Sequence, residues 1–267
     1  MLVLPRLRGA LAAMLCSLLC SNCAALMYRT PDLVRTWDEA IVAVPGSDRI
    51  LRGKDLMDPK NPAISEIQAP LPVVLYLHGC TGIGELEIEF GQSLANQGYL
   101  FIAPNSFARR YRPLQCDPVH QTGGFNLFVF DFRMAEVSNA LEQLKRSRIV
   151  DPDHLYLMGG SEGGVVAALY RGDQFSGRVI FQWTCTGSPL VRGIAAPHGE
   201  PVLAIVNQGD PWYDEQHTTG QAGDCGPYLS ERPNSRSIIL KRPGMHDVLS
   251  IPNVRVAIFD FLAQLSH

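Results

Sequence analysis

The sequence predicts an α/β fold in which a mostly parallel sheet packs against helices. Short apolar runs of strand length alternate with segments of helical periodicity along most of the chain. Strands joined through helices form right-handed crossovers, which leaves neighbouring strands parallel. The predicted functional residues are arranged around one unit of strand, glycine-rich turn and helix at residues 154–170.

Composition and charge restrict the class of protein. Of the 267 residues, 46% are hydrophobic and 18% are charged, which is typical of one sizeable globular domain, placed here at 26–267. A formal net charge of −3 argues against nucleic acid as the main partner.

Residues 1–25 have the pattern of a signal peptide. Two arginines precede an apolar stretch at 10–19 that is too short to span a membrane, and small residues follow it. We therefore expect cleavage after this stretch and export to the periplasm or the medium, with no membrane span. A lipid anchor on Cys20 or Cys23 is the alternative, although the residues before them fit a lipoprotein signal poorly.

Four of the seven cysteines lie beyond the predicted signal peptide, at positions 80, 116, 185 and 225. An even number of cysteines in an oxidising compartment indicates disulfides. Four cysteines allow three pairings, between which this arithmetic does not choose, and four free buried thiols are the alternative.

The first half of the domain is predicted to contribute four strands. Residues 28–37 have no clear period, and a segment with three prolines at 54–70 is predicted to be a loop. In order, we expect strands at 39–45 and 49–52 joined as a hairpin, a strand at 72–78, a helix at 85–97, a strand at 99–104 and a long loop at 105–124.

The second half is predicted to contribute four more strands and three helices. Apolar residues recur at steps of three and four from Leu127 to Leu144, which predicts an amphipathic helix. Beyond it we expect strands at 154–158, 178–183, 201–206 and 235–241, and helices at 165–170 and 254–265. In such a sheet the ligand lies beyond the carboxyl ends of the strands.

Gly159-Gly-Ser-Glu-Gly163 matches the pattern G-x-S-x-G between a strand and a helix, which is the setting of a nucleophile elbow. The glycines relieve crowding at the turn, so that Ser161 can take a strained conformation with its hydroxyl exposed. The start of the following helix favours developing negative charge. We predict that Ser161 is a nucleophile; the alternative is a glycine-rich turn with an incidental serine.

A serine hydroxyl needs a base that removes its proton, and the base needs an orienting acid. In elbow enzymes these residues follow the serine in the order acid, then histidine. His246, between the last strand and the last helix, is the predicted base. Asp210, four residues after the strand at 201–206, is the predicted acid, with Asp214 as the alternative; Asp247 is interpreted as a helix cap or a surface acid.

Backbone N–H donors for an oxyanion are expected from two places. One is Glu162, the residue after the nucleophile, and the other is Cys80 in the loop after the strand at 72–78. His78 opens this loop and precedes the serine in the chain, so we interpret it as a support for the loop rather than as the base.

Four further residues are candidates for substrate binding. Arg109 and Arg110 lie on the long loop at the active-site end of the sheet, where a guanidinium would pair with a substrate carboxylate; solvated surface arginines are the alternative. Trp183 and Trp212 lie at or after strand ends on the same side, and they are predicted either to wall the pocket or to pack in the core.

Four motifs together resemble the α/β-hydrolase superfamily, and most of all its dienelactone hydrolase branch, over about residues 35–267. The resemblance implies an eight-stranded, mainly parallel sheet with helices on both faces, no cofactor or metal, and hydrolysis of esters or lactones. It assigns Ser161 as nucleophile, Asp210 as acid and His246 as base. Dienelactone hydrolase itself uses a cysteine nucleophile and is cytosolic, so the substrate is left open. The motifs are Leu77-His-Gly-Cys80, Gly159-Gly-Ser-Glu-Gly163, Gly209-Asp210 and Gly244-Met-His246.

The sheet order of this family also implies a disulfide pairing. The strand before Cys80 lies beside the strand before Cys116, and the strand before Cys185 lies beside the strand before Cys225. The resemblance therefore implies the bridges Cys80–Cys116 and Cys185–Cys225, each with Cα atoms within about 4.4–6.8 Å.

These observations predict an exported serine hydrolase that cleaves small carboxylic esters or lactones through an acyl-enzyme. An acyltransferase with the same triad is the nearest alternative. A non-catalytic binding protein on the same scaffold is the alternative from another class, because a fold does not dictate a function.

Overall fold

The computed structural model describes residues 31–123, 128–183, 185, 193–212 and 224–266. The predictions for the signal peptide at 1–25 and for Asp214 lie outside these residues. Within the described ranges, no helix is both long enough and apolar enough to cross a membrane.

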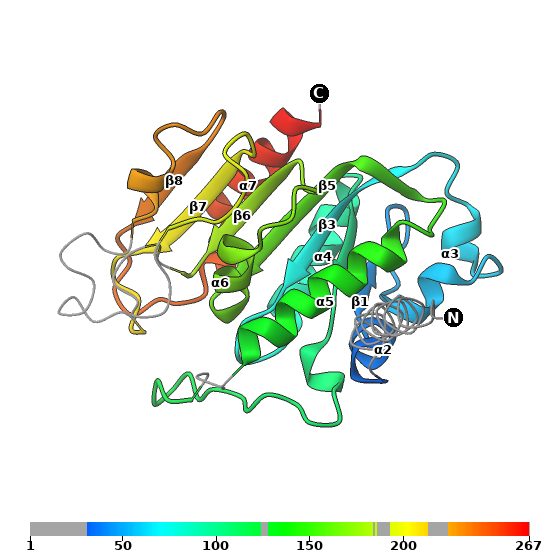
Figure 1. The fold of residues 1–267 in the computed structure, drawn as a ribbon, viewed down its shortest axis with the longest axis horizontal. Helices are drawn as coiled ribbons and strands as arrows, with labels where there is room; N and C mark the ends of the chain where they lie inside the picture. The colour runs from blue at the N-terminus through cyan, green and yellow to red at the C-terminus, as the bar shows by residue number, and fades with distance from the viewer. Residues whose placement is uncertain (1–30, 124–127, 184, 186–192, 213–223, 267) are drawn as a thin grey trace, which may run out of the picture.

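The described residues form one eight-stranded sheet with the order β2-β1-β4-β3-β5-β6-β7-β8 (Figure 1). In it β1 pairs antiparallel with β2 and β4, whereas every pair from β4 to β8 is parallel. The predicted mostly parallel sheet is therefore confirmed. The strands are β1 (Ile41–Ala43), β2 (Leu51–Arg52), β3 (Leu71–Leu77), β4 (Leu100–Ala103), β5 (Val150–Gly160), β6 (Gly177–Phe181), β7 (Val202–Asn207) and β8 (Arg236–Leu240).

Helices cover both faces of the sheet, as predicted. In Figure 1, α5 and α6 lie in front of the sheet, and α4 and α7 lie behind it. The α-helices are α2 (Pro31–Asp38), α3 (Pro62–Ser65), α4 (Glu85–Asn96), α5 (Val129–Leu144), α6 (Glu162–Leu169) and α7 (Pro252–Leu265). The 3₁₀ turns are η1 (Gly53–Met57), η2 (Ser106–Ala108), η3 (Gly226–Tyr228) and η4 (Val248–Ser250).

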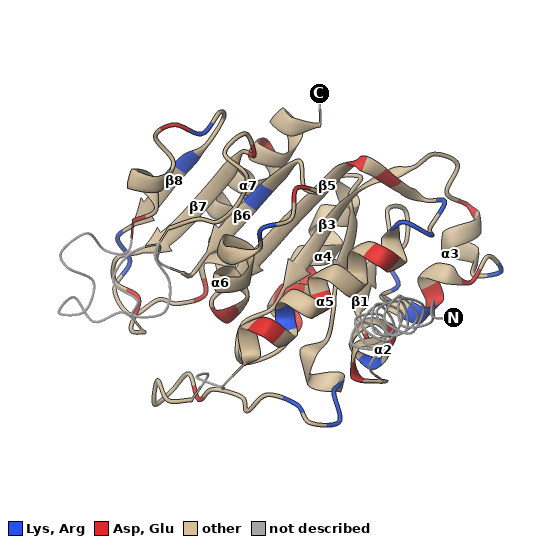
Figure 2. Cartoon of the chain, in the orientation of Figure 1, with Lys and Arg blue, Asp and Glu red and all other residues tan. Residues whose placement is uncertain are grey.

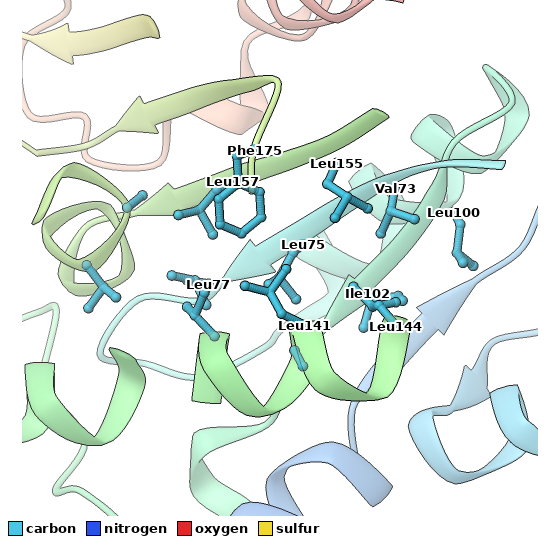
Figure 3. Packing of buried hydrophobic residues seen from close by; sticks show 14 of the residues in the cluster. Val73, Leu75, Leu77, Leu100, Ile102, Leu141, Leu144, Leu155, Leu157 and Phe175 are labelled. Carbon is cyan, nitrogen blue, oxygen red and sulfur yellow. The ribbon is translucent and has the colours of Figure 1, made fainter. Parts of the chain in front are cut away.

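The core consists of two apolar clusters, one on each face of the sheet. On one face, Leu75 and Leu77 of β3 pack with Leu141 and Leu144 of α5 (Figure 3). On the other face, Tyr76 of β3 packs in a cluster with side chains from α4 and α7. Because both faces are buried, the strands are continuous apolar runs rather than alternating ones.

Two segments differ from the sequence prediction. Residues 31–38 form helix α2, because Leu33 and Trp37, one turn apart, are buried against the domain. The predicted loop at 54–70 contains most of η1 and all of the one-turn helix α3, which begins where the Asn61 side chain accepts a hydrogen bond from the Ala63 N–H.

The described residues contain two disulfides, and their pairing is the predicted one. The Cα atoms of Cys80 and Cys116 are 5.4 Å apart, and those of Cys185 and Cys225 are 4.9 Å apart. The reason lies in the sheet order, because β3 pairs with β4 and β6 pairs with β7. Each bridge thus joins loops that leave neighbouring parallel strands.

Candidate active site

Ser161 is the single residue between the end of β5 and the start of α6, and its backbone angles are φ 53° and ψ −122°. A positive φ in a residue other than glycine costs about 1–3 kcal/mol and persists only where the surroundings enforce it. Here the Ser161 N–H donates to the Phe181 carbonyl at 3.0 Å, and the Ser161 carbonyl accepts from the Val165 N–H at 3.2 Å. The turn is therefore fastened to the neighbouring strand and to the helix.

The glycines of the motif are required by close backbone contacts. A Cβ atom on Gly163 would lie 2.1 Å from the Leu77 carbonyl oxygen, and one on Gly159 would lie 2.3 Å from the Gly163 oxygen. Any side chain at either position would therefore push α6 away from the ends of β3 and β5. The G-x-S-x-G pattern reflects this packing as well as the turn itself.

Asp210 and His246 form a hydrogen-bonded pair at the ends of β7 and β8. The His246 Nδ1–H donates to Asp210 Oδ2 at 2.6 Å, and the other carboxylate oxygen accepts from the Trp212 N–H at 3.0 Å. Asp210 is 2% exposed, whereas the His246 side chain is 19% exposed. With its Nδ1 proton held by Asp210, the imidazole keeps the Nε2 lone pair for a substrate or nucleophile proton.

Two buried amide side chains hold the loop that carries His246. Asn207, at the end of β7, donates to the carbonyls of Arg242 at 2.7 Å and Met245 at 2.6 Å, and it accepts from the Arg242 N–H at 2.8 Å. Gln182, directly after β6, donates to the His246 carbonyl at 2.6 Å. Neither residue was predicted from the sequence; their positions directly at strand ends were the available signal.

Gln182 also binds Asp247, the acid that directly follows His246 in the chain. Its amide nitrogen donates to Asp247 Oδ1 at 3.0 Å. Asp247 thus holds Gln182, while Asp210 holds the histidine ring. The Gln182 Oε1 atom lies 3.0 Å from the position of a Cβ on Gly160, so this side chain binds the histidine loop and lies beside the serine turn.

The loop after β3 lies directly against the serine. A Cβ placed on Gly79 would be 3.4 Å from the Ser161 Cβ and 3.9 Å from its Oγ. The next residue, Cys80, is tied to Cys116 by the disulfide, and its carbonyl accepts from the Cys116 N–H at 3.2 Å. The loop predicted to supply an oxyanion donor is therefore close to Ser161 and covalently braced.

His78 is buried beneath this loop as a neutral imidazole. The Ser106 N–H donates to its Nε2 at 3.2 Å, so its proton is on Nδ1, which donates to the Gly79 carbonyl at 2.6 Å. Burial, and next the positive charge of Arg133, hold the pKa of His78 well below its usual value. With both nitrogens engaged, His78 supports the loop, as expected, and is not placed to act as a base.

Arg133 of α5 joins this loop to the serine turn. Its guanidinium pairs with Glu162 Oε1 at 2.7 Å and donates to the carbonyls of His78 and Gly79. Burial raises the pKa of Glu162, an effect that the charge of Arg133 opposes. Arg133 was not among the residues predicted from the sequence, although it lies on the same helix face as the buried Val137, which was the available signal.

The two candidate arginines differ in their surroundings. The Arg109 Nε donates to Glu136 Oε1 at 2.7 Å, and this side chain is only 7% exposed. Arg110 is exposed, with its guanidinium 5.6 Å from the centre of the Tyr111 ring. A substrate carboxylate would have to compete with Glu136 for Arg109, whereas Arg110 lies in solvent.

The two candidate tryptophans also differ. The Trp212 ring lies 5.9 Å from the His246 ring, so it borders the site. Trp183 packs against the apolar cluster beneath α6, with its Cβ 3.0 Å from the position of a Cβ on Gly164. The structure therefore brings Trp212 to the site and places Trp183 against the core.

The candidate site residues lie at the edge of the sheet where parallel α/β sheets bind their ligands. The strained serine, the carboxylate-bound imidazole and the loop beside the serine all follow the carboxyl ends of parallel strands, at one edge of the sheet. Among the described residues, no group of three or more His, Cys, Asp or Glu side chains has the arrangement of a metal site.

Comparisons with known proteins agree with this reading of the fold. The sequence model of the Dienelactone hydrolase family matches residues 60–221, more than half of the chain. A search of curated protein sequences gives no significant match.

Three solved structures illustrate the similarity. A putative dienelactone hydrolase from Klebsiella pneumoniae aligns with a TM-score of 0.55 and 18% identity, over 74% of this chain and 88% of its own. Esterase PE8 aligns with a TM-score of 0.53 and 18% identity, over 74% and 94%. Est1E from Butyrivibrio proteoclasticus, with ferulic acid bound, aligns with a TM-score of 0.53 and 13% identity, over 85% and 94%. At these identities the likeness shows the α/β-hydrolase fold, and with the family match it establishes that this chain belongs to the dienelactone hydrolase family, which supports hydrolysis of esters.

Proposed function

We propose that this protein is an exported serine hydrolase that cleaves small carboxylic esters or lactones through an acyl-enzyme. The observation that carries the proposal is the strained Ser161 at the start of α6, at the same edge of the sheet as the hydrogen-bonded Asp210–His246 pair. Family membership supports the reaction class, hydrolysis of esters. The residue at the nucleophile position of the motif is Ser161 rather than a cysteine, which supports a serine acyl-enzyme.

In the first step, His246 Nε2 takes the proton of Ser161 as the serine oxygen attacks the ester carbonyl carbon. Asp210, buried and bonded to Nδ1, keeps the ring in the required tautomer and stabilises the imidazolium that forms. The imidazolium then gives its proton to the departing alkoxide, which leaves an acyl group on Ser161. A lactone opens in the same step, and its alcohol stays attached to the acyl group.

The negative charge that develops on the carbonyl oxygen needs donors that are already in place. The N–H groups of Cys80 and Glu162 are the proposed donors, one on each side of Ser161. In the second half of the reaction, water donates a proton to His246 Nε2 as its oxygen attacks the acyl carbon. The bond from that carbon to Ser161 Oγ then breaks, the serine oxygen takes the proton back from His246, and the carboxylic acid leaves. Loss of one such donor typically lowers kcat about 10²–10³-fold.

The test is hydrolysis of p-nitrophenyl acetate, a γ-lactone and methyl ferulate, the last because Est1E has been solved with ferulic acid. Ser161→Ala is expected to lower kcat by about four orders of magnitude or more while the thermal unfolding temperature stays near that of the wild type. Ser93→Ala, a serine on α4, is the matched control and should retain full activity. Equal hydrolysis by wild type and Ser161→Ala would sink the proposal.

Export is supported by the signal-like segment and by the two disulfides, which fit an extracellular protein. Cell fractionation followed by intact mass measurement tests it. A mature chain that begins near residue 25, outside the cytoplasm, is the expected result. A cytoplasmic chain that keeps residues 1–25 would contradict export, and a diacylglycerol mass on Cys20 or Cys23 would indicate the lipid anchor.

A further inference from the structure

We infer that Arg133 is a positioning residue for the oxyanion hole, because its single guanidinium sets the two backbone segments that supply the donors. The inference rests on the proposed function, since that proposal assigns the donors to Cys80 and Glu162. It adds a residue from α5, an element that contributes none of the proposed reacting groups. Figure 2 shows charged residues of both signs in the first half of this helix.

On the serine side, Arg133 holds the first residue of α6. Its Nη2 atom lies 2.7 Å from Oε1 of Glu162, whose backbone N–H is the proposed donor next to Ser161. The side chains of Arg133 and Glu162 are 1% and 7% exposed, so solvent screens this pair little. Movement of the guanidinium would therefore be transmitted to the serine turn through one side chain.

On the other side, Arg133 holds the loop after β3. Its Nη1 donates to the His78 carbonyl and its Nη2 to the Gly79 carbonyl at 3.3 Å. In a planar trans peptide the C=O and the following N–H point in opposite directions. Holding the Gly79 carbonyl therefore also fixes the direction of the Cys80 N–H.

Other donors share the Gly79 carbonyl without reaching the serine turn. The His78 Nδ1–H donates to it at 2.6 Å and the Gly82 N–H at 3.2 Å, and both belong to the same loop. Arg133 differs because the same guanidinium also contacts Glu162. It therefore sets the spacing between the two donor segments, in addition to the shape of one of them.

Stability alone is a weak reason for such a pair. Taking two charges out of water costs several kcal/mol per ion, and apolar residues of similar volume often stabilise a fold as well or better. The position of Arg133 between the two proposed donor segments explains why a buried ion pair is present here without requiring that the pair stabilise the fold.

The chain contains a matched control in Arg178 of β6. It is also fully buried, pairs with Glu200 at 2.6 Å and donates to backbone carbonyls. Those carbonyls, of Ala167, Tyr170 and Gly172, lie at or after the far end of α6. Arg133 and Arg178 thus hold opposite ends of one helix, and only Arg133 holds the end at the site.

The experiment compares Arg133→Met with Arg178→Met. The readouts are unfolding temperature, kcat and KM for p-nitrophenyl acetate, and the Ki of a trifluoromethyl ketone that forms a tetrahedral adduct on serine. Arg133→Met is expected to lower kcat about 10²-fold and raise Ki by a similar factor, with KM changed less than threefold, because the loss falls on the tetrahedral state. Arg178→Met is expected to lower the unfolding temperature with kcat and Ki within threefold of wild type.

Glu162→Gln and Arg133→Lys serve if Arg133→Met does not fold. Both keep a polar partner in place and are expected to lower kcat less than Arg133→Met, with Ki rising in proportion. If Arg133 variants change kcat and Ki no more than Arg178→Met does, the inference is wrong while Ser161-dependent hydrolysis still stands. If the wild type shows no Ser161-dependent hydrolysis, the proposed function fails first, and the inference fails with it.

Discussion

Single residues at the strand ends define the geometry of the site. Ser161 and Gln182 both have φ of 53°, and each directly follows the last residue of one of the neighbouring strands β5 and β6. Their side chains serve different loops, since Gln182 binds the loop of His246. Strain of this kind is found where a functional position is fixed by its surroundings.

The assignment of the acid is tested by Asp210→Asn. An amide would leave the His246 ring in place without the charge that stabilises the imidazolium, so kcat is expected to fall about 10³–10⁴-fold. Asp247→Asn is the control; it alters the bond to Gln182 and is expected to lower kcat less than tenfold. Steady-state kinetics with one activated ester measures both values of kcat. A larger loss of kcat in Asp247→Asn than in Asp210→Asn would assign the role of the acid to Asp247 instead.

The buried neutral His78 makes stability depend on pH. Because its folded pKa lies below 6.5, the unfolded chain binds a proton that the folded chain does not as the pH falls below 6.5. Unfolding free energy then decreases by up to about 1.4 kcal/mol per pH unit, until the pH reaches the lowered pKa. Arg133 is the charged group that contributes to this shift. Glu136 reaches His78 only through Ser106, whose hydroxyl donates to the Glu136 carboxylate and whose N–H donates to His78 Nε2.

Urea unfolding of wild type and His78→Asn at pH 5, 6 and 7.5 measures this contribution. The variant lacks the titrating group, so the advantage of the wild type over it is expected to shrink as the pH falls. His198→Asn, a histidine-to-asparagine change at an exposed position, is the control. A wild-type advantage that stays constant from pH 7.5 to 5 would show that His78 is not held neutral.

Among the elements, α5 acts as a support for the site as well as a core helix. Leu141 and Leu144 in its second half pack on β3, whereas Arg133 and Glu136 in its first half face the loops after β3 and β4. Glu136 accepts from the hydroxyl of Ser106 at 2.6 Å and also pairs with Arg109. One helix therefore joins the packing of the sheet to the positions of the loops at its carboxyl edge.

The disulfide between the loops after β3 and β4 gives a prediction at this scale. Cys80 and Cys116 are 8% and 7% exposed, whereas Cys185 and Cys225 are fully buried. A reductant is therefore expected to open Cys80–Cys116 first, and activity to fall while the unfolding signal is unchanged, because this bridge braces the loop beside Ser161. Dithiothreitol titration with activity, circular dichroism and thiol mapping measures the order.

The matched control for the titration is the double variant Cys185→Ala/Cys225→Ala, which keeps only the bridge near the serine. It is expected to be less stable by about 2–4 kcal/mol but to lose activity over the same reductant range as the wild type. Activity that disappears only together with the folded signal would contradict a local role for Cys80–Cys116.

For the molecule as a whole, the parallel sheet follows from local signals, whereas its strand order was implied by the family resemblance. Each buried strand is a short apolar run ended by glycine or a polar turn, and the helices α4, α5 and α6 follow β3, β4 and β5, so the parallel sheet was predictable. Helix α2 was not, because two turns are too few to show a period. Its burial depends on distant contacts, such as the bond from the Asn139 amide to the Leu33 carbonyl.

The same distinction applies to the site. Ser161, Asp210 and His246 could be proposed because each follows a strand with a glycine nearby, in an order that elbow enzymes share. The pair of Arg133 and Glu162 could not, since no local pattern connects the middle of one helix to the start of the next. Such contacts depend on how α5 crosses the sheet, which emerges only in the folded chain.

The central claim is that Ser161 is the nucleophile of an ester hydrolase, and covalent labelling tests it most directly. The wild-type protein is treated with a fluorophosphonate, digested and mapped by mass spectrometry, with Ser161→Ala treated in parallel. The account predicts one phosphonylated site, in the peptide containing Gly159-Gly-Ser-Glu-Gly163, loss of esterase activity in proportion to labelling, and no label in the variant. Label on another residue, or equal labelling of Ser161→Ala, would contradict it.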